Sequence, residues 1–182
     1  IRLDAQIVRK HEADRRRLET QRNIRLAMTD PLTGLHNRRF AMPRLGELTA
    51  DAAEMRRDLA VMVLDLDSFK RVNDRHGHAA GDAVLCEIAA RLAAALPEDA
   101  LLARIGGDEF VIIQSSIGER EFHNRINRLQ EYMKQDQISI SIGFLWKASC
   151  ENLENMLKEA DHRMYEAKKA YYQTADRRTH NH

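Results

Sequence analysis

The sequence predicts an α/β fold of the α+β type: a central, mostly antiparallel sheet flanked by helices and preceded by a long N-terminal helix. Short runs rich in β-branched and apolar residues alternate with longer segments in which apolar residues recur every three or four positions. Two of the short runs, 101–105 and 109–114, are separated by a Gly-Gly tip, which is typical of a β-hairpin. The order strand–helix–strand–strand–helix–strand then favours an antiparallel sheet with helices packed on one face.

The N-terminal segment, residues 1–28, contains neither Gly nor Pro, and this composition predicts one continuous helix. At about 1.5 Å per residue such a helix is roughly 40 Å long. Its apolar residues are too widely spaced for a regular coiled-coil seam; they are Ile7, Val8, Leu18, Ile24 and Met28. Two interpretations stay open, a signalling and dimerisation helix or a solvated helical arm.

The remaining elements follow from chain breakers and from periodicity. Pro31 and Gly34 interrupt the first helix, and Asn37 can cap the next one. The predicted elements are, in order, a helix at about 38–56, a strand at 60–66, a short helix from Ser68, a loop at 74–82, a helix to about Leu96, strands at 101–105 and 109–114, a helix through Phe122 and Met133, a strand at 138–146, and a helix through Leu153 and Met164. Residues 176–182 are expected to form a disordered tail.

Composition and charge exclude several classes of protein. The 182 residues carry a formal net charge of +1, so there is no overall electrostatic footprint for nucleic acid. No apolar run approaches the ~20 residues of a membrane span, and no signal peptide opens the chain. Cys86 and Cys150 lack metal-ligand spacing and favour a reducing, cytoplasmic compartment. Because the chain begins with Ile1, we expect a fragment of a larger protein with a sensor or membrane anchor upstream.

Carboxylates gather at the ends of two predicted strands. Asp65 and Asp67 share one side at the end of strand 60–66, and Asp108 and Glu109 follow the Gly-Gly tip. Two carboxylates ~4 Å apart at an effective dielectric near 20 repel by ~4 kcal/mol. A raised pKa or a divalent cation relieves that repulsion, and bare glycine backbone would let a phosphate approach. An acidic turn with surface ion pairs is the alternative, and these residues alone leave both open.

Several longer motifs resemble one known family. GGDEF at 106–110 is the signature of the GGDEF family, the diguanylate cyclases. DPLTGLHNRR at 30–39 and DLDSFKRVNDRHGHAAGD at 65–82 resemble further motifs of that family, as do ISISIG at 138–143 and ADHRMYEAKK at 160–169. The resemblance covers about 30–170, with the motifs in the expected order, and places the catalytic domain at 29–175.

The resemblance implies a ferredoxin-like palm, similar to adenylate cyclases and polymerases, that condenses two GTP into cyclic di-GMP and releases two pyrophosphates. Two such domains would face each other in a homodimer set by the N-terminal helix. Asp65 and Asp108, helped by the Leu66 carbonyl, would hold two Mg²⁺ (or Mn²⁺) per active site. Glu109 would be a further essential acid, which makes the catalytic set Asp65, Asp108 and Glu109.

The resemblance also implies the substrate-binding residues. Gly106 and Gly107 would lie against the nucleotide, and Asn73 and Asp82 would hydrogen-bond guanine. Asp82 also has a plain structural interpretation, as an acid at a helix N-terminus. The phosphate and base contacts would come from Phe69, Lys70 and Lys168, although Phe69 also fits the core, and Lys70 also fits a solvated helix face.

Two departures from the family pattern stand out. The family places an arginine after the last lysine motif, in the sequence GRN, whereas this chain has YYQ at 171–173 with Tyr172 at the arginine position. The family's RxxD product-inhibition motif is replaced by PEDA at 97–100. We therefore expect a cyclase that micromolar cyclic di-GMP does not suppress. The alternative is a catalytically silent GGDEF module that binds GTP and regulates a partner.

Overall fold

The computed structural model describes residues 2–135, 139–147 and 153–179. Within these residues the chain forms one five-stranded sheet and six helices. The strands are β1 (His36–Asn37), β2 (Leu59–Leu66), β3 (Leu101–Arg104), β4 (Glu109–Ser115) and β5 (Ile140–Lys147), and their order across the sheet is β1-β3-β4-β2-β5. Of the strand pairs that the structure describes, only β1 and β3 run in parallel, which confirms the prediction of a mostly antiparallel sheet.

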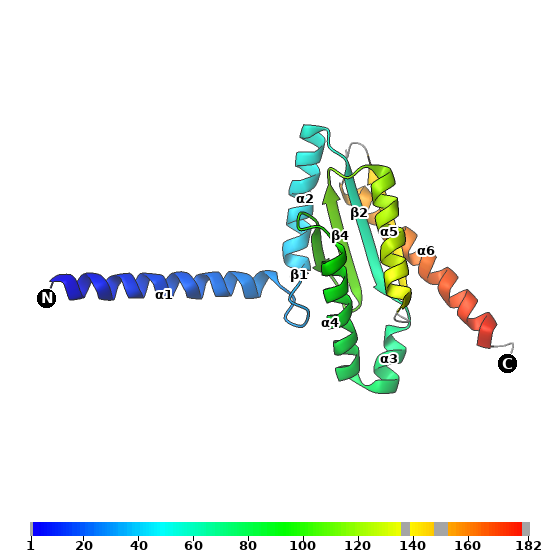
Figure 1. Cartoon of the computed structure of the whole chain (residues 1–182), viewed down its shortest axis with the longest axis horizontal. Coiled ribbons are helices and arrows are strands. Elements are labelled where there is room, and N and C mark those ends of the chain that lie inside the picture. Colours follow the sequence, from blue (N-terminus) through cyan, green and yellow to red (C-terminus); the bar gives the residue numbers. More distant parts are fainter. Residues whose placement is uncertain (1, 136–138, 148–152, 180–182) are drawn as a thin grey trace.

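The helices lie close to the predicted segments. They are α1 (Arg2–Met28), α2 (Arg38–Met55), α3 (Phe69–His76), α4 (His78–Ala95), α5 (Glu119–Gln135) and α6 (Leu153–Thr179). Asn37 caps α2 as expected, because its side-chain oxygen accepts a hydrogen bond from the backbone N–H of Phe40 at 3.1 Å. Figure 1 shows α1 projecting away from the body of the molecule. No helix among the described residues is long and apolar enough to cross a membrane.

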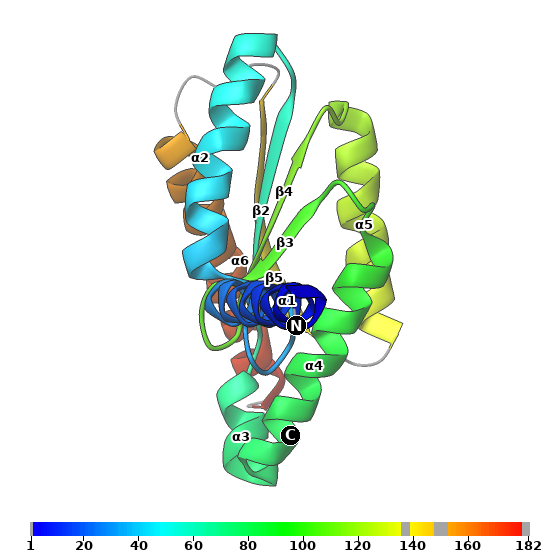
Figure 2. The same cartoon turned by 90° about the vertical axis from the view of Figure 1, so that its left-hand side faces the viewer.

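Helices cover both faces of the sheet, so the prediction that they pack on one face was wrong. In Figure 2 the sheet lies between α2 on one side and α4 and α5 on the other. Leu85 and Phe122 belong to the buried cluster on the α4–α5 side, whereas Leu45 and Met164 belong to the cluster formed with α2 and α6. All eight residues of β2 are buried. A strand covered on both faces is continuously apolar rather than alternating, and the run AVMVL already carried that signal.

Three boundaries differ from the sequence prediction. The loop expected at 74–82 is limited to a break at Gly77, where φ is +84°, and α4 begins at His78. Strand β1 was not predicted because two residues carry no periodic signal. Helix α6 continues to Thr179, so residues 176–179 of the expected disordered tail are helical. Residues 180–182 and the start of the predicted strand at 138 lie outside the described residues.

Candidate active site

The register of β2 and β4 brings the predicted acids to one end of the sheet. Asp65 near the end of β2 pairs with Glu109 at the start of β4. The backbone N–H of Leu66 donates to the carbonyl oxygen of Asp108 at 3.3 Å. The end of β2 and the hairpin tip are therefore neighbours, and Asp65, Asp108 and Glu109 lie at the same end of the sheet.

Asp65 is the most buried of these acids, with 4% of its surface exposed. Lys168 of α6 donates from Nζ to its Oδ1 at 2.5 Å. Burial raises the pKa of the Asp65 carboxyl; the hydrogen bond from Lys168 opposes this rise, and the charges of Asp108 and Glu109 add to it. One ammonium therefore faces three carboxylates, and the site keeps an excess of negative charge.

Lys168 is held in place by the way α6 packs on the sheet. Gly143 of β5 lies against the α6 backbone, where a Cβ on the glycine would overlap Ala160 and Met164. Lys168 follows Met164 by one helical turn and reaches Asp65 from there. Burial on its own would lower the pKa of the Lys168 ammonium, but Asp65, with smaller contributions from Asp108 and Tyr172, raises it overall. The lysine is thus a stable cation at the site.

The donor set fits a hard divalent cation. Among the described residues no three His, Cys, Asp or Glu side chains are gathered closely enough to hold a metal by themselves. Mg²⁺, however, is commonly held by one or two carboxylates with the rest of its ligands from water and substrate phosphates. The residues that would hold it are Asp65 and Asp108, with the Leu66 carbonyl. Burial is the main cause of the raised pKa of Asp65, and a cation there would offset the charges of Asp108 and Glu109 that add to it.

Asp67 serves a different purpose from Asp65. Its Oδ1 accepts from the Ser141 hydroxyl and its Oδ2 from the Ser139 hydroxyl, both at 2.6 Å. Its backbone N–H also donates to the Ser139 carbonyl at 3.0 Å. Asp67 therefore fastens the end of β2 to β5 and is not drawn into the acid cluster.

The two signature glycines do not owe their identity to turn geometry. Neither has φ in the left-handed region, which among the described glycines is occupied by Gly34 and Gly77. A Cβ on Gly106 would overlap the carboxylate of Glu109, whereas a Cβ on Gly107 would meet no protein atom within 4 Å. Gly106 thus makes room for Glu109, and Gly107 leaves an open, exposed surface beside the acids.

The residues expected to read guanine surround the contact between α3 and α4. Asn73 of α3 packs against Gly81 of α4, where any Cβ would overlap the asparagine amide and approach Phe69 Cζ at 3.2 Å. The Oδ1 atom of Asn73 is buried and has no hydrogen-bond partner among the described residues. Asp82 is exposed next to Gly81, and because α4 begins at His78 it lies beyond the first helical turn. That position weakens the helix-terminus interpretation of Asp82.

The other predicted residues are less closely tied to the acids. Phe69 packs against the core cluster on the α4–α5 side, as its second interpretation anticipated. Lys70 is exposed on α3, and no ion pair joins it to the described residues. Sequence reasoning placed Tyr172 only as a missing arginine; in the structure its hydroxyl accepts from the backbone N–H of Ser68 at 3.2 Å.

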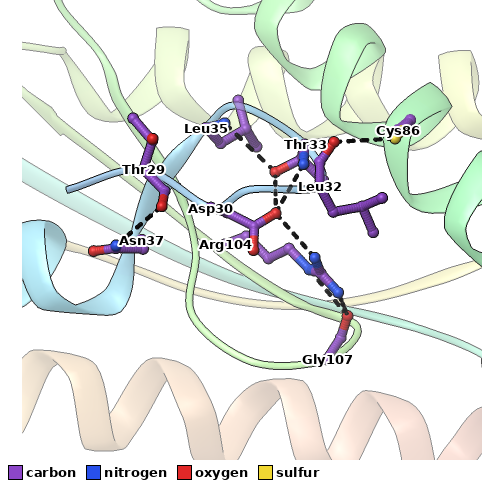
Figure 3. Close-up of polar contacts among 9 residues, drawn as sticks. All are labelled: Thr29, Asp30, Leu32, Thr33, Leu35, Asn37, Cys86, Arg104 and Gly107. Carbon is purple, nitrogen blue, oxygen red and sulfur yellow. Dashed lines mark hydrogen bonds and ion pairs between the residues drawn. The ribbon is translucent and has the colours of Figure 1, made fainter. Parts of the chain in front are cut away.

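Arg104 holds the hairpin tip and was missed by the sequence analysis. Figure 3 shows its guanidinium between the tip and the connector that follows α1. Nη1 donates to Asp30 Oδ1 at 2.9 Å, and Nε and Nη2 donate to the Gly107 carbonyl at 3.1 and 2.6 Å. Asp30 also accepts from the backbone and hydroxyl of Thr33. The Asp-Pro start of 30–39 signalled a side-chain-stabilised turn, but not its arginine partner.

A family model described as "Diguanylate cyclase, GGDEF domain" matches residues 27–173. That span is most of the chain and includes every element of the site. The chain belongs to the GGDEF family.

Two relatives illustrate the resemblance within the GGDEF family. The chain is 39% identical over 151 residues to Diguanylate cyclase TpbB of Pseudomonas aeruginosa, covering 77% of this chain and 35% of that protein. It is 34% identical over 179 residues to Response regulator PleD of Caulobacter vibrioides, covering 92% of this chain and 39% of that protein. The chain thus spans little more than a third of the length of these relatives.

Solved GGDEF structures share the fold. The coiled coil and GGDEF domain of DgcB from Caulobacter crescentus, in complex with c-di-GMP, superposes with a TM-score of 0.84 at 26% identity, covering 92% of this chain and 95% of that one. The diguanylate cyclase SiaD from Pseudomonas aeruginosa, in complex with its activator SiaC, gives 0.74 at 28% identity, covering 93% and 72%. The DgcB match extends over more of the chain than the family model does.

Proposed function

We propose that this GGDEF domain condenses two GTP into cyclic di-GMP and two pyrophosphates. The observation that carries the proposal is the convergence of Asp65, Asp108 and Glu109 at one end of the sheet, with Lys168 as their cation. Such a site has the charges that nucleotidyl transfer requires, because acids can hold a metal and a lysine can neutralise phosphate. Membership of a family of diguanylate cyclases supports the same reaction.

Each half-reaction joins the 3′-oxygen of one GTP to the α-phosphorus of the other. The α–β phosphoanhydride bond breaks, pyrophosphate leaves with its bonding electron pair, and the 3′-hydroxyl loses its proton. When bound, Mg²⁺ or Mn²⁺, two per site on the family pattern, would supply positive charge for the α-phosphate and the leaving group. Asp65, Asp108 and the Leu66 carbonyl are the residues proposed to hold it, and Glu109 is proposed as the adjacent essential acid.

Asn73 and Asp82 are proposed to select guanine. Guanine presents N1–H and N2–H₂ donors, which the exposed Asp82 carboxylate and the unpartnered Asn73 Oδ1 can accept. Adenine lacks this pair of donors and would leave polar groups of the site unpaired, which penalises its binding. Phe69 and Lys70 are proposed to flank the nucleotide, and Lys168 to contact the β- and γ-phosphates.

Two domains must face each other, because one site holds one GTP and the product needs two. We propose that α1 pairs two copies and sets their orientation, as a signalling helix below an upstream sensor. Leu18 and Leu26 support the proposal, since they are 65% and 63% exposed on a helix that projects from the body. The coiled coil named in the DgcB structure supports it as well.

The decisive experiment mixes the chain with GTP and Mg²⁺ and separates the nucleotides by chromatography. The wild type is expected to produce cyclic di-GMP, and Asp108→Ala is expected to abolish it. Asp51→Ala, an exposed acid on α2, is the matched control and should retain activity. A version forced to dimerise through an added zipper is assayed in parallel, since a monomer cannot bring two GTP together.

The alternative function is a silent module that binds GTP and regulates a partner. The neutral Tyr172 at the position of the family's arginine is the observation that favours it. Saturable GTP binding by the forced dimer with no cyclic di-GMP formed would establish the silent module and overturn the cyclase.

We also propose that the domain lacks the primary product-inhibition site. Residues 97–100, between α4 and β3, read Pro-Glu-Asp-Ala. They contain no arginine that could bind a phosphate through two hydrogen bonds.

A further inference from the structure

Tyr172 connects α6 to the turn that follows the buried acid. It lies four residues after Lys168, so the two side chains share one face of the helix, about 6 Å apart along its axis. Its hydroxyl accepts a hydrogen bond from the backbone N–H of Ser68 at 3.2 Å. Ser68 separates β2 from α3 and has a φ of +59°. The phenol therefore lies at the same end of the sheet as Asp65.

The Tyr172 hydroxyl still has a proton to donate. A phenolic oxygen can accept one hydrogen bond and donate another at the same time. Within the part of the chain that the structure describes, no protein group accepts from this hydroxyl. Tyr172 as a whole residue is 42% exposed, so a ligand can reach it. The Ser68 amide thus positions the oxygen and leaves its O–H available.

A charged donor lies beside this neutral one. Burial lowers the pKa of the Lys168 ammonium and Asp65 raises it, and Tyr172 is close enough to add to that rise. An ammonium and a phenol on the same face of α6, one helical turn apart, can both contact one polyphosphate chain. The ammonium reduces the charge of such a chain, and the phenol adds a directional hydrogen bond.

We propose that Tyr172 is a substrate-binding residue that donates its phenolic hydrogen to the β- or γ-phosphate of the bound triphosphate, with its oxygen positioned by the Ser68 amide. This inference rests on the proposed function, because it requires a nucleoside triphosphate at this site. Tyr172 would then contact the phosphates through a neutral donor, in addition to the charged contact that Lys168 makes.

Tyr172→Phe tests the proposal by removing a single oxygen atom, and Tyr171→Phe is the matched control. Tyr171 is the neighbouring residue, and no hydrogen bond joins its hydroxyl to the described residues. The probes are α,β-methylene-GTP, which cannot lose pyrophosphate, and GMP, which lacks the β- and γ-phosphates. Dissociation constants are measured by calorimetry on the full chain, together with thermal unfolding of each variant.

Tyr172→Phe is expected to weaken binding of α,β-methylene-GTP roughly ten- to a hundredfold, the loss typical of one hydrogen bond to a charged acceptor. Its GMP affinity, and both affinities of Tyr171→Phe, should match the wild type. Unchanged or tighter triphosphate binding by Tyr172→Phe would overturn the inference, and so would an equal loss for GMP and the triphosphate. A wild type that binds no triphosphate would instead overturn the proposed function, so the two failures are distinguishable.

Discussion

Gly106 and Gly107 are adjacent in the signature, but their surroundings differ. A side chain at 106 would overlap the carboxylate of Glu109, so that position is restricted by the protein itself. A side chain at 107 would meet no protein atom within 4 Å, and the backbone there needs no left-handed conformation. The folded domain therefore has no need of glycine at 107, which supports the proposal that the nucleotide lies against it.

Gly107→Ala is expected to leave stability within about 0.5 kcal/mol of the wild type, because the added methyl group has room. Nucleotide affinity should fall on the order of tenfold or more, since the methyl group occupies space that we assign to the nucleotide. Calorimetry with α,β-methylene-GTP and urea unfolding measure the two quantities. Gly46→Ala, equally unobstructed but on α2, is the control for affinity. Wild-type nucleotide affinity in Gly107→Ala would contradict the assignment of this surface to the nucleotide.

The surroundings of His36 predict how the free energy of unfolding depends on pH. Its ring stacks on Phe40 at 3.9 Å between centroids, and its Nδ1 is buried without a partner among the described residues. Burial lowers the pKa of His36 from 6.5, and a hydrogen bond that the ring donates to the Met28 backbone carbonyl acts in the opposite direction. The folded state therefore holds this proton less tightly than the unfolded chain.

The contribution of His36 to the free energy of unfolding should therefore be highest above pH 6.5, should fall as the pH drops from 6.5 toward the lowered folded-state pKa, and should level off below it. Urea unfolding at a series of pH values between 5 and 7.5 measures the effect. His36→Gln removes the titrating group, so its unfolding free energy should change less over that range. An equal pH dependence in both proteins would contradict the assignment.

At the residue scale, sequence could predict the acids but not the groups that hold them. Asp65 and Asp108 could be predicted because Asp65 lies near the end of one apolar strand and Asp108 directly precedes another. An ionised side chain in such a place costs free energy unless it is paired or binds a ligand. The partners of these groups are far away along the chain: Arg104 joins Asp30 across 74 residues, and Tyr172 joins Ser68 across 104. No local pattern carries such pairings, because they arise only when the sheet forms.

At the element scale, every α1 side chain that the structure describes, from residue 11 to residue 28, is exposed. Leu18, Ile24 and Leu26 are among them, and Figure 1 shows the helix extending outward from the sheet. Apolar side chains on a projecting helix lose solvent contact only if another surface covers them. The sequence predicted the helix from its lack of Gly and Pro, but its sparse apolar residues could not identify its partner.

Substituting both Leu18→Glu and Ile24→Glu should shift the chain from dimer to monomer in sedimentation velocity experiments, because a paired helix would then bury charge. Cyclic di-GMP formation per domain should fall at least tenfold, whereas α,β-methylene-GTP affinity should remain unchanged. Gln21→Glu, at an exposed polar position of the same helix, is the matched control. A double variant that is monomeric yet fully active would refute the pairing role of α1.

At the scale of the whole molecule, two helical layers enclose the sheet, and the acids lie at one of its ends. Strand β3 runs from residues 97–100 toward the hairpin tip and has four residues. At about 3.3 Å per residue, roughly 13 Å separates the two ends of that strand. The region where the family carries its inhibitory motif is therefore distinct from the end of the sheet where the acids lie, and residues 97–100 can be substituted without changing the acids.

Initial rates of cyclic di-GMP synthesis should accordingly be unchanged by added product at micromolar concentration. The pair Pro97→Arg and Ala100→Asp supplies the missing arginine and acid and should introduce inhibition, measured in the same assay. Saturable product binding to the wild type with its active site blocked by α,β-methylene-GTP would contradict the prediction.

Gly143 influences the position of Lys168 at the acid site although it does not contact the acids. The backbone of α6 rests directly on this glycine, with Met164 Cα 2.8 Å from the place where a Cβ would be. A larger residue there would lift the helix, and Lys168, one turn further along, would lose its reach to Asp65. Position 143 therefore acts as a spacer that sets the height of the helix above the sheet. An inactivating variant at 143 would report on that height, although the residue touches none of the reacting groups.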